Sequence, residues 1–186
     1  MKVGFLSRRC RAPSISAGAL LLCAILLTTF AANAGPSPPL RLAIFDFELE
    51  DFSAGATLAA ENPADDSEQL KTCTNEARRL IAQPGRYTLV DISSADAQAV
   101  KEHWLRKCDG CEAASALKLG AERSFIGIVT RISRMEYSVR FQIRDAQTGA
   151  VISNKQTDLR MGANYSWSRG AAWLIKNRLL DSQDQP

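Results

Sequence analysis

The chain has 186 residues, of which 23 are Lys or Arg and 20 are Asp or Glu, and its formal net charge at pH 7 is +3. Four of the bases and none of the acids lie in the first 34 residues, so the remainder carries 19 bases against 20 acids, a net charge of −1. A nearly neutral chain has no general field that attracts nucleic acid, and we expect no nucleic-acid partner.

The amino terminus is typical of a secretory signal peptide. A basic segment precedes the uncharged apolar stretch 17–30, and Ala32-Asn33-Ala34 supplies the small residues that signal peptidase accepts. The apolar stretch makes about 21 Å of helix, which is short for a hydrocarbon core of roughly 30 Å. Cys23 follows leucines instead of a small residue, which argues against a lipid-modified cysteine.

We therefore predict export to the periplasm, or secretion, with no integral membrane segment after signal cleavage. The expected organisation is a signal peptide (1–34), a flexible lead (35–39), a single α/β domain (40–181) and a short tail (182–186).

The first predicted elements are a strand, a long loop and a helix. Residues 42–47 are apolar on both faces, as in a strand that is covered on both sides. Residues 50–66 are acidic and lack periodicity, which predicts a loop. Ser67 is a candidate N-cap for a helix to about Gln83, with one apolar stripe made by Leu70, Cys73, Ala77, Leu80 and Ile81.

Short elements follow. Residues 87–90 predict a strand, and a second helix is expected from Ser93 or Ser94 to about Leu105. A third, short helix is expected from Cys111 to Gly120, because glycine commonly ends a helix.

The last third predicts an antiparallel hairpin and a final helix. Residues 124–132 form an apolar strand, and 137–143 alternate, with Val139, Phe141 and Ile143 expected inside and Arg140, Gln142 and Arg144 expected in solvent. A turn at 145–149 leads to a strand at 151–159, and a helix begins near Ser166. The order βαβααβββα predicts an α/β fold, with a mixed sheet of about five strands and helices packed on it.

Six segments stand out as motifs: Arg41–Asp51, Gly85–Asp91, Cys108-Asp-Gly-Cys111, Leu119–Ala121, Ile143–Gly149 and the turn Arg160–Trp167. Together they resemble a family of exported bacterial proteins that is catalogued only as a domain of unknown function, although Met161 stands where that family usually has glycine. More remotely, the layout resembles the amino-terminal domain of TolB and the CsgG-type envelope modules. That resemblance implies an assembly or interaction module instead of an enzyme.

Three cysteines remain after signal removal, and in an oxidising compartment they should not all stay reduced. We expect a structural disulfide between Cys108 and Cys111, with Cys73 as an alternative partner that otherwise lies buried on its apolar stripe. The rival interpretation is a thiol–disulfide oxidoreductase that uses Cys108 and Cys111, because a Cys-x-x-Cys at a helix start favours the thiolate.

Other enzymatic signatures are missing from the sequence. His103 is the only histidine, which is too few for a zinc site without further ligands at the right spacing. The sequence contains no G-x-S-x-G, P-loop or G-x-G-x-x-G motif. We expect no catalytic residue, no metal and no cofactor.

Charge is distributed unevenly along the chain. Residues 41–70 carry eight acids against one base, and 118–178 carry eleven bases against four acids. This asymmetry either orients a partner or is neutralised within the fold. A cleft at the carboxyl ends of the first two strands, beside the acidic loop, is a candidate small-ligand site.

The final helix offers a candidate partner surface. Trp173 lies about 200° from the centre of the face formed by Trp167, Leu174 and Ile175, at roughly 100° per residue. Its neighbours on that side are Arg169, Lys176 and Leu180. Because Trp and Arg are favoured at interface centres, this face is either a docking surface or is covered by another helix. Our interpretation is an exported, non-enzymatic module that binds another envelope protein.

Overall fold

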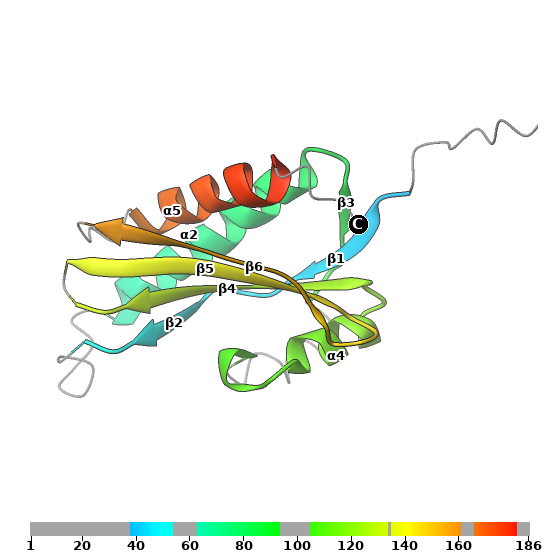
Figure 1. Cartoon of the computed structure of the whole chain (residues 1–186), viewed down its shortest axis with the longest axis horizontal. Helices are drawn as coiled ribbons and strands as arrows, with labels where there is room; N and C mark the ends of the chain where they lie inside the picture. Colours follow the sequence, from blue (N-terminus) through cyan, green and yellow to red (C-terminus); the bar gives the residue numbers. More distant parts are fainter. Residues whose placement is uncertain (1–37, 54–62, 94–104, 134, 161–165, 182–186) are drawn as a thin grey trace, which may run out of the picture. The chain divides into compact units, whose positions relative to one another are not determined.

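The structure is a computed structural model that describes residues 38–53, 63–93, 105–133, 135–160 and 166–181. All of them belong to one compact unit, Pro38–Pro186. They form a mixed α/β fold around a six-stranded sheet in the order β3-β1-β4-β5-β6, with β2 paired to β4 (Figure 1). The α/β class and the mixed sheet agree with the prediction.

The first half of the domain supplies the parallel part of the sheet. Strand β1 (Leu40–Ile44) pairs in parallel with β3 (Tyr87–Leu89) on one side and with β4 (Arg123–Arg131) on the other. Helix α2 (Pro63–Ala82) lies between β1 and β3 in sequence, and the single 3₁₀ turn η1 (Leu105–Lys107) and helix α4 (Cys111–Lys118) precede β4.

The second half is antiparallel, as the alternating pattern predicts. Strand β5 (Glu136–Asp145) pairs with β4 and with β6 (Val151–Arg160), which forms one edge of the sheet. The turn before β6 ends at Gly149, whose φ of +71° suits glycine. Helix α5 (Ser166–Ile175) then continues into a π-helical turn, η2 (Lys176–Leu180).

The sheet separates two cores. Helices α2 and α5 cover one face, and α4 covers part of the other (Figure 1). Strand β1 contributes to both, because Leu42 and Ile44 belong to the larger core and Ala43 to the smaller one. The expectation of a first strand that is apolar on both faces is therefore confirmed. Trp167 of α5 is fully buried in the larger core.

The expected strand at 42–47 ends earlier, at Ile44, and Glu50 and Asp51, the first residues of the expected loop, belong to a second strand. After β1, residues 45–47 interrupt the strand, and β2 (Glu48–Asp51) pairs in parallel with the second half of β4. The buried hydroxyl of Thr74 accepts a hydrogen bond from Phe47 N at 2.9 Å and so attaches this interruption to α2. Helix α2 also begins at Pro63, before the expected cap at Ser67.

The prediction of a fully wet face on β5 was wrong. Val139, Phe141 and Ile143 are buried as expected, but Arg140, Gln142 and Arg144 are only partly exposed. Their face is partly covered by η1 and α4, and the Arg144 side chain there is only 16% exposed. Residues 94–104, which hold most of the expected second helix and His103, lie outside the described residues.

Candidate functional site

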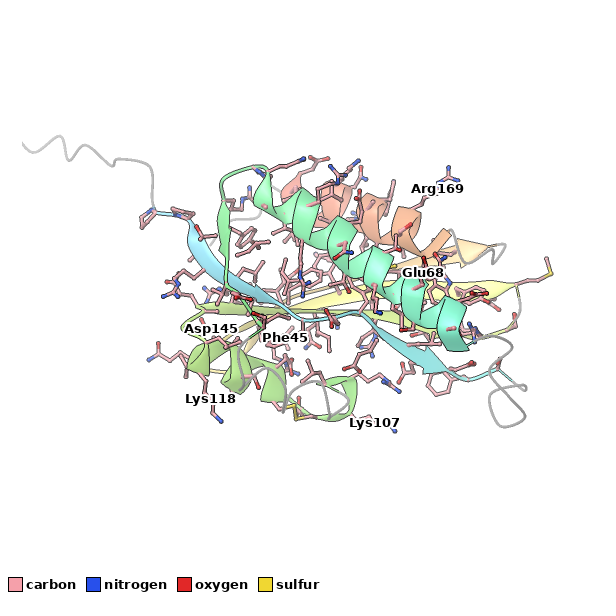
Figure 2. The ribbon with its side chains drawn as sticks, turned by 180° about the vertical axis from the view of Figure 1, so that it is seen from behind. Phe45, Glu68, Lys107, Lys118, Asp145 and Arg169 are labelled. Atoms are coloured by element: carbon pink, nitrogen blue, oxygen red, sulfur yellow. A yellow bond between two sulfur atoms is a disulfide. The ribbon has the colours of Figure 1, made fainter. Side chains whose placement is uncertain are left out.

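The outer face of α5 carries a partly exposed indole. Trp173 is 47% exposed, whereas Trp167, six residues earlier on the same helix, is fully buried. The difference follows from helix geometry, because the buried residues of α5 form one stripe against the larger core and Trp173 points to the opposite side. Figure 2 shows Arg169, one helical turn before Trp173, pointing away from the sheet.

Cations surround this indole. Arg178 places its guanidinium carbon 5.9 Å from the centre of the Trp173 ring, a cation–π contact. Arg169 and Lys176 are exposed, and Asn177 donates a hydrogen bond to the Trp173 carbonyl at 2.7 Å. Residues 166–180 contain no acid. The outer face of α5 and η2 is therefore a cationic surface with an aromatic centre.

The π turn changes the position of Leu180 in this surface. Leu180 is partly buried and packs against the larger core. Because a π-helix bonds residue i to i+5, it advances fewer degrees per residue than an α-helix, and Leu180 does not return to the side of Trp173. The exposed surface is thus Arg169, Trp173, Lys176 and Arg178, which we call the Trp173 surface.

Part of the charge asymmetry along the sequence is neutralised within the fold. Acids of the first segment meet arginines from distant elements: Asp46 meets Arg78 (3.2 Å), Glu48 meets Arg106 (3.0 Å), Glu50 meets Arg140 (3.6 Å), and Asp51 and Asp66 both meet Arg131 (2.8 and 2.7 Å). These pairs attach β2 and α2 to the rest of the sheet. Arg131 and Arg140 are the members of the basic segment in these pairs, so part of the asymmetry serves the fold, and the Trp173 surface is a separate cationic feature.

Arg131 is the centre of this network. Its guanidinium lies 5.7 Å from the ring centre of Tyr137 and 5.6 Å from that of Trp167. Burial would lower the pKa of Arg131, but hydrogen bonds to Asp66 and Asp51 outweigh burial and raise it. Partial burial would likewise raise the pKa of Asp51, yet hydrogen bonds from Ser53 and Arg131 lower it. Both groups stay charged at neutral pH.

The cysteines are placed as follows. Cys108 and Cys111 are joined in a disulfide, and Cys73 is buried and unbonded, with burial raising the pKa of its thiol to about 12. Arg144 of β5 fastens the disulfide segment, because it bonds Asp109 (2.8 Å) before α4 and Glu112 (2.8 Å) within it. The adjoining pocket has about 160 Å³ and is lined largely by charged side chains.

A larger pocket lies at the carboxyl ends of β1 and β3, where the sequence suggested a cleft. It has a volume of about 420 Å³ and is lined by Ile44, Asp46, Arg78, Leu89, Val90, Asp91, Ile92 and Ser93. Arg78 of α2 crosses it, with hydrogen bonds to the Ile44 carbonyl (3.1 Å) and to Asp46 (3.2 Å). Among the described residues, no group of three or more Asp, Glu, His or Cys is placed to hold a metal ion.

Residues 40–179 match the DUF3280 family, described as "Protein of unknown function (DUF2380)". The chain belongs to this family. The match confirms the expected resemblance to a family known only as a domain of unknown function. No curated protein matches the chain. Within the part of the DUF3280 chain that the structure describes, no helix has the length and apolarity needed to cross a membrane.

Solved structures similar to this DUF3280 chain include the LpoB C-terminal domain, the lipoprotein GNA1162 and TolB. The LpoB C-terminal domain from Salmonella enterica is 16% identical, with 76% of this chain and 94% of that one covered and a TM-score of 0.47. Lipoprotein GNA1162 from Neisseria meningitidis is 11% identical, with 78% and 99% covered and a TM-score of 0.47. TolB from Acinetobacter baumannii is 12% identical, with 76% and 28% covered and a TM-score of 0.43. At these identities the likeness concerns the fold alone.

Proposed function

We propose that this DUF3280 protein is exported to the periplasm with a cleaved signal peptide and acts there as a non-enzymatic module. In this proposal it binds another envelope protein through the Trp173 surface. The observation that carries the proposal is the half-exposed indole of Trp173 on a helix whose other face is fully buried. Large aromatic side chains lose water favourably at the centre of an interface, which makes tryptophan the residue most enriched among binding hot spots.

The partner that fits this surface is acidic. Arg169, Lys176 and Arg178 flank the indole on a stretch without acids. Glu76 of α2 is bonded to Arg79 at 2.6 Å. This hydrogen bond is the main cause of the lowered pKa of Glu76, and the charge of Lys176 contributes less. Asp or Glu side chains of a partner would complement Arg169 and Lys176, so binding should weaken as salt is added.

Crosslinking inside the periplasm tests the proposal. A photoreactive phenylalanine analogue replaces Trp173 in one strain and Leu117 in another. Leu117 is a matched control, because it is 49% exposed but lies on α4, on the other face of the sheet. We expect position 173 alone to give a specific protein adduct, whose acidic surface is then checked with the purified partner. Equal adducts at both positions, or none at 173, would contradict the proposal.

The rival function is thiol–disulfide exchange by Cys108 and Cys111. The structure offers little support for it, because the pocket beside Cys108 is smaller than the roughly 300 Å³ of typical ligand sites. Arg144 also ties the disulfide segment to β5 through Asp109, between the two cysteines, and through Glu112, just after the second. Equilibration with redox buffers measures the reduction potential of the Cys108–Cys111 disulfide. A potential of about −120 to −200 mV favours thiol–disulfide exchange, and one below about −300 mV favours a structural bond.

A further inference from the structure

The 420 Å³ pocket lies where the path of the chain reverses across the sheet. From β1 the chain first forms β2 beside β4 and then crosses through α2 to β3 on the other side of β1, and from β3 it returns past β1 to β4. The helices of these two connections lie on opposite faces of the sheet (Figure 1). In open α/β sheets, such reversals leave a crevice beyond the carboxyl ends of the strands, where ligands bind.

The position of β2 determines on which side of β1 the crevice is open. Because β2 pairs with the second half of β4, it occupies the position beside β4 beyond the carboxyl end of β1. The hollow therefore remains between the ends of β1 and β3. Val90 extends the pairing of β3 by donating to the Leu42 carbonyl at 2.9 Å, and Asp91–Ser93 then turn along the rim of the pocket.

The lining has a defined chemistry. Two carboxylates, Asp46 and Asp91, face the pocket together with the single guanidinium of Arg78, so its ionised groups sum to −1. Arg78 is already engaged with Asp46 and the Ile44 carbonyl. Asp91 is fixed by hydrogen bonds from Ser93 N (2.9 Å) and Ser93 Oγ (2.8 Å). The remaining walls are aliphatic: Ile44, Leu89, Val90 and Ile92.

We propose that this pocket, which we call the β1–β3 cleft, binds a small organic amine. The ammonium group donates to the carboxylates of Asp46 and Asp91, and an apolar body lies against the aliphatic walls. The volume falls within the 300–1,000 Å³ range of small-molecule sites, and a few polar groups on an apolar lining are their usual composition. An anionic ligand is disfavoured, because the ionised groups of the lining leave a net charge of −1.

Amide chemical shifts of the purified protein test the proposal with defined probes. The probes are n-hexylamine, n-hexanol and n-hexanoate, which share an apolar chain and differ in charge. We expect millimolar n-hexylamine to shift the amides of Ile44, Asp46, Asp91 and Ser93 saturably, and the other two probes to bind at least tenfold more weakly.

Substitutions of the two aspartates test whether their carboxylates bind the ammonium group. Asp46→Asn and Asp91→Asn should each weaken n-hexylamine binding severalfold while keeping the dispersed amide spectrum of a folded protein. Asp158→Asn, at an exposed position on β6, should have no effect and serves as the matched control. No saturable shift with n-hexylamine would overturn the proposal, as would equal binding of n-hexanol or n-hexanoate. The cleft is separate from the Trp173 surface, so either proposal can fail without the other.

Discussion

At the scale of single residues, a side chain that neutralises a buried charge contributes more to stability than its position in the sequence pattern suggests. Arg144 looks like a solvent residue in the alternating pattern of β5, yet its Nε lies 2.8 Å from Glu112, whose side chain is only 4% exposed. Arg144→Ala should therefore lower the free energy of unfolding by about 3 kcal/mol, because it leaves a buried carboxylate without its cation. Chemical denaturation measures the change.

Two variants control this measurement. Arg169→Ala removes an exposed arginine and should cost under about 0.5 kcal/mol. Adding Glu112→Ala to Arg144→Ala should recover part of the loss, since the unpaired charge is then gone. Equal small effects of Arg144→Ala and Arg169→Ala would show that Glu112 does not depend on Arg144.

Asp51 gives the domain a predictable sensitivity to acid. Its pKa in the folded state is lower than its ordinary value near 3.9, so folding favours the carboxylate. The stabilisation is complete above the ordinary pKa and is lost as the pH falls through the lowered folded value. Asp51→Asn should therefore lower stability at neutral pH and flatten its decline below about pH 4. Thermal unfolding between neutral and acidic pH checks this, and Asp158→Asn, an exposed control, should keep the steep decline.

At the scale of elements, β2 and the interruption at residues 45–47 depend on a close approach of the Phe47 ring to β4 that only glycine allows. A Cβ atom on Gly127 of β4 would lie 2.3 Å from the buried ring of Phe47. Gly127→Ala should cost about 1–3 kcal/mol, because the ring must move within a packed core. In denaturant titrations the double variant Gly127→Ala/Phe47→Leu should lose less than the sum of the single variants. Strict additivity would mean that the two residues do not meet.

Elements with strong local signals were predictable, and those that depend on distant partners were not. The stripe of α2, the hairpin of β5 and β6 and the buried Trp167 follow from periodicity alone. Strand β2 does not, because Glu48–Asp51 has little apolar surface and is a strand through its pairing with β4 and its distant arginines. The π turn at 176–180 and the cover over Arg144 likewise arise from tertiary packing. The position of the cleft at the ends of β1 and β3 was predictable, but nothing in the sequence indicated that Arg78, from the middle of α2, lines it.

At the scale of the whole molecule, the proposed function requires export. Ala32 and Ala34 predict cleavage after residue 34, so the exported protein should begin at Gly35. Intact-mass measurement of the protein released from the periplasm checks this, and the cytoplasmic precursor is the control. A mature mass that retains residues before Gly35 would contradict the predicted cleavage site.

The Trp173 surface also predicts that stability and binding respond separately. Trp167→Ala removes a fully buried indole and should cost about 3–5 kcal/mol of stability. Trp173→Ala should cost much less, because nearly half of its surface is already in water. Iodide should quench the fluorescence of Trp173 and leave that of Trp167 largely unaffected.

The most direct measurement is the affinity of the Trp173→Ala protein for the partner captured at position 173, determined beside its unfolding midpoint. We predict a loss of at least about 2 kcal/mol in binding free energy with a nearly unchanged midpoint, as expected of an interface hot spot. Wild-type affinity in the Trp173→Ala protein, or a loss of stability as large as that of Trp167→Ala, would contradict the proposed role of this surface.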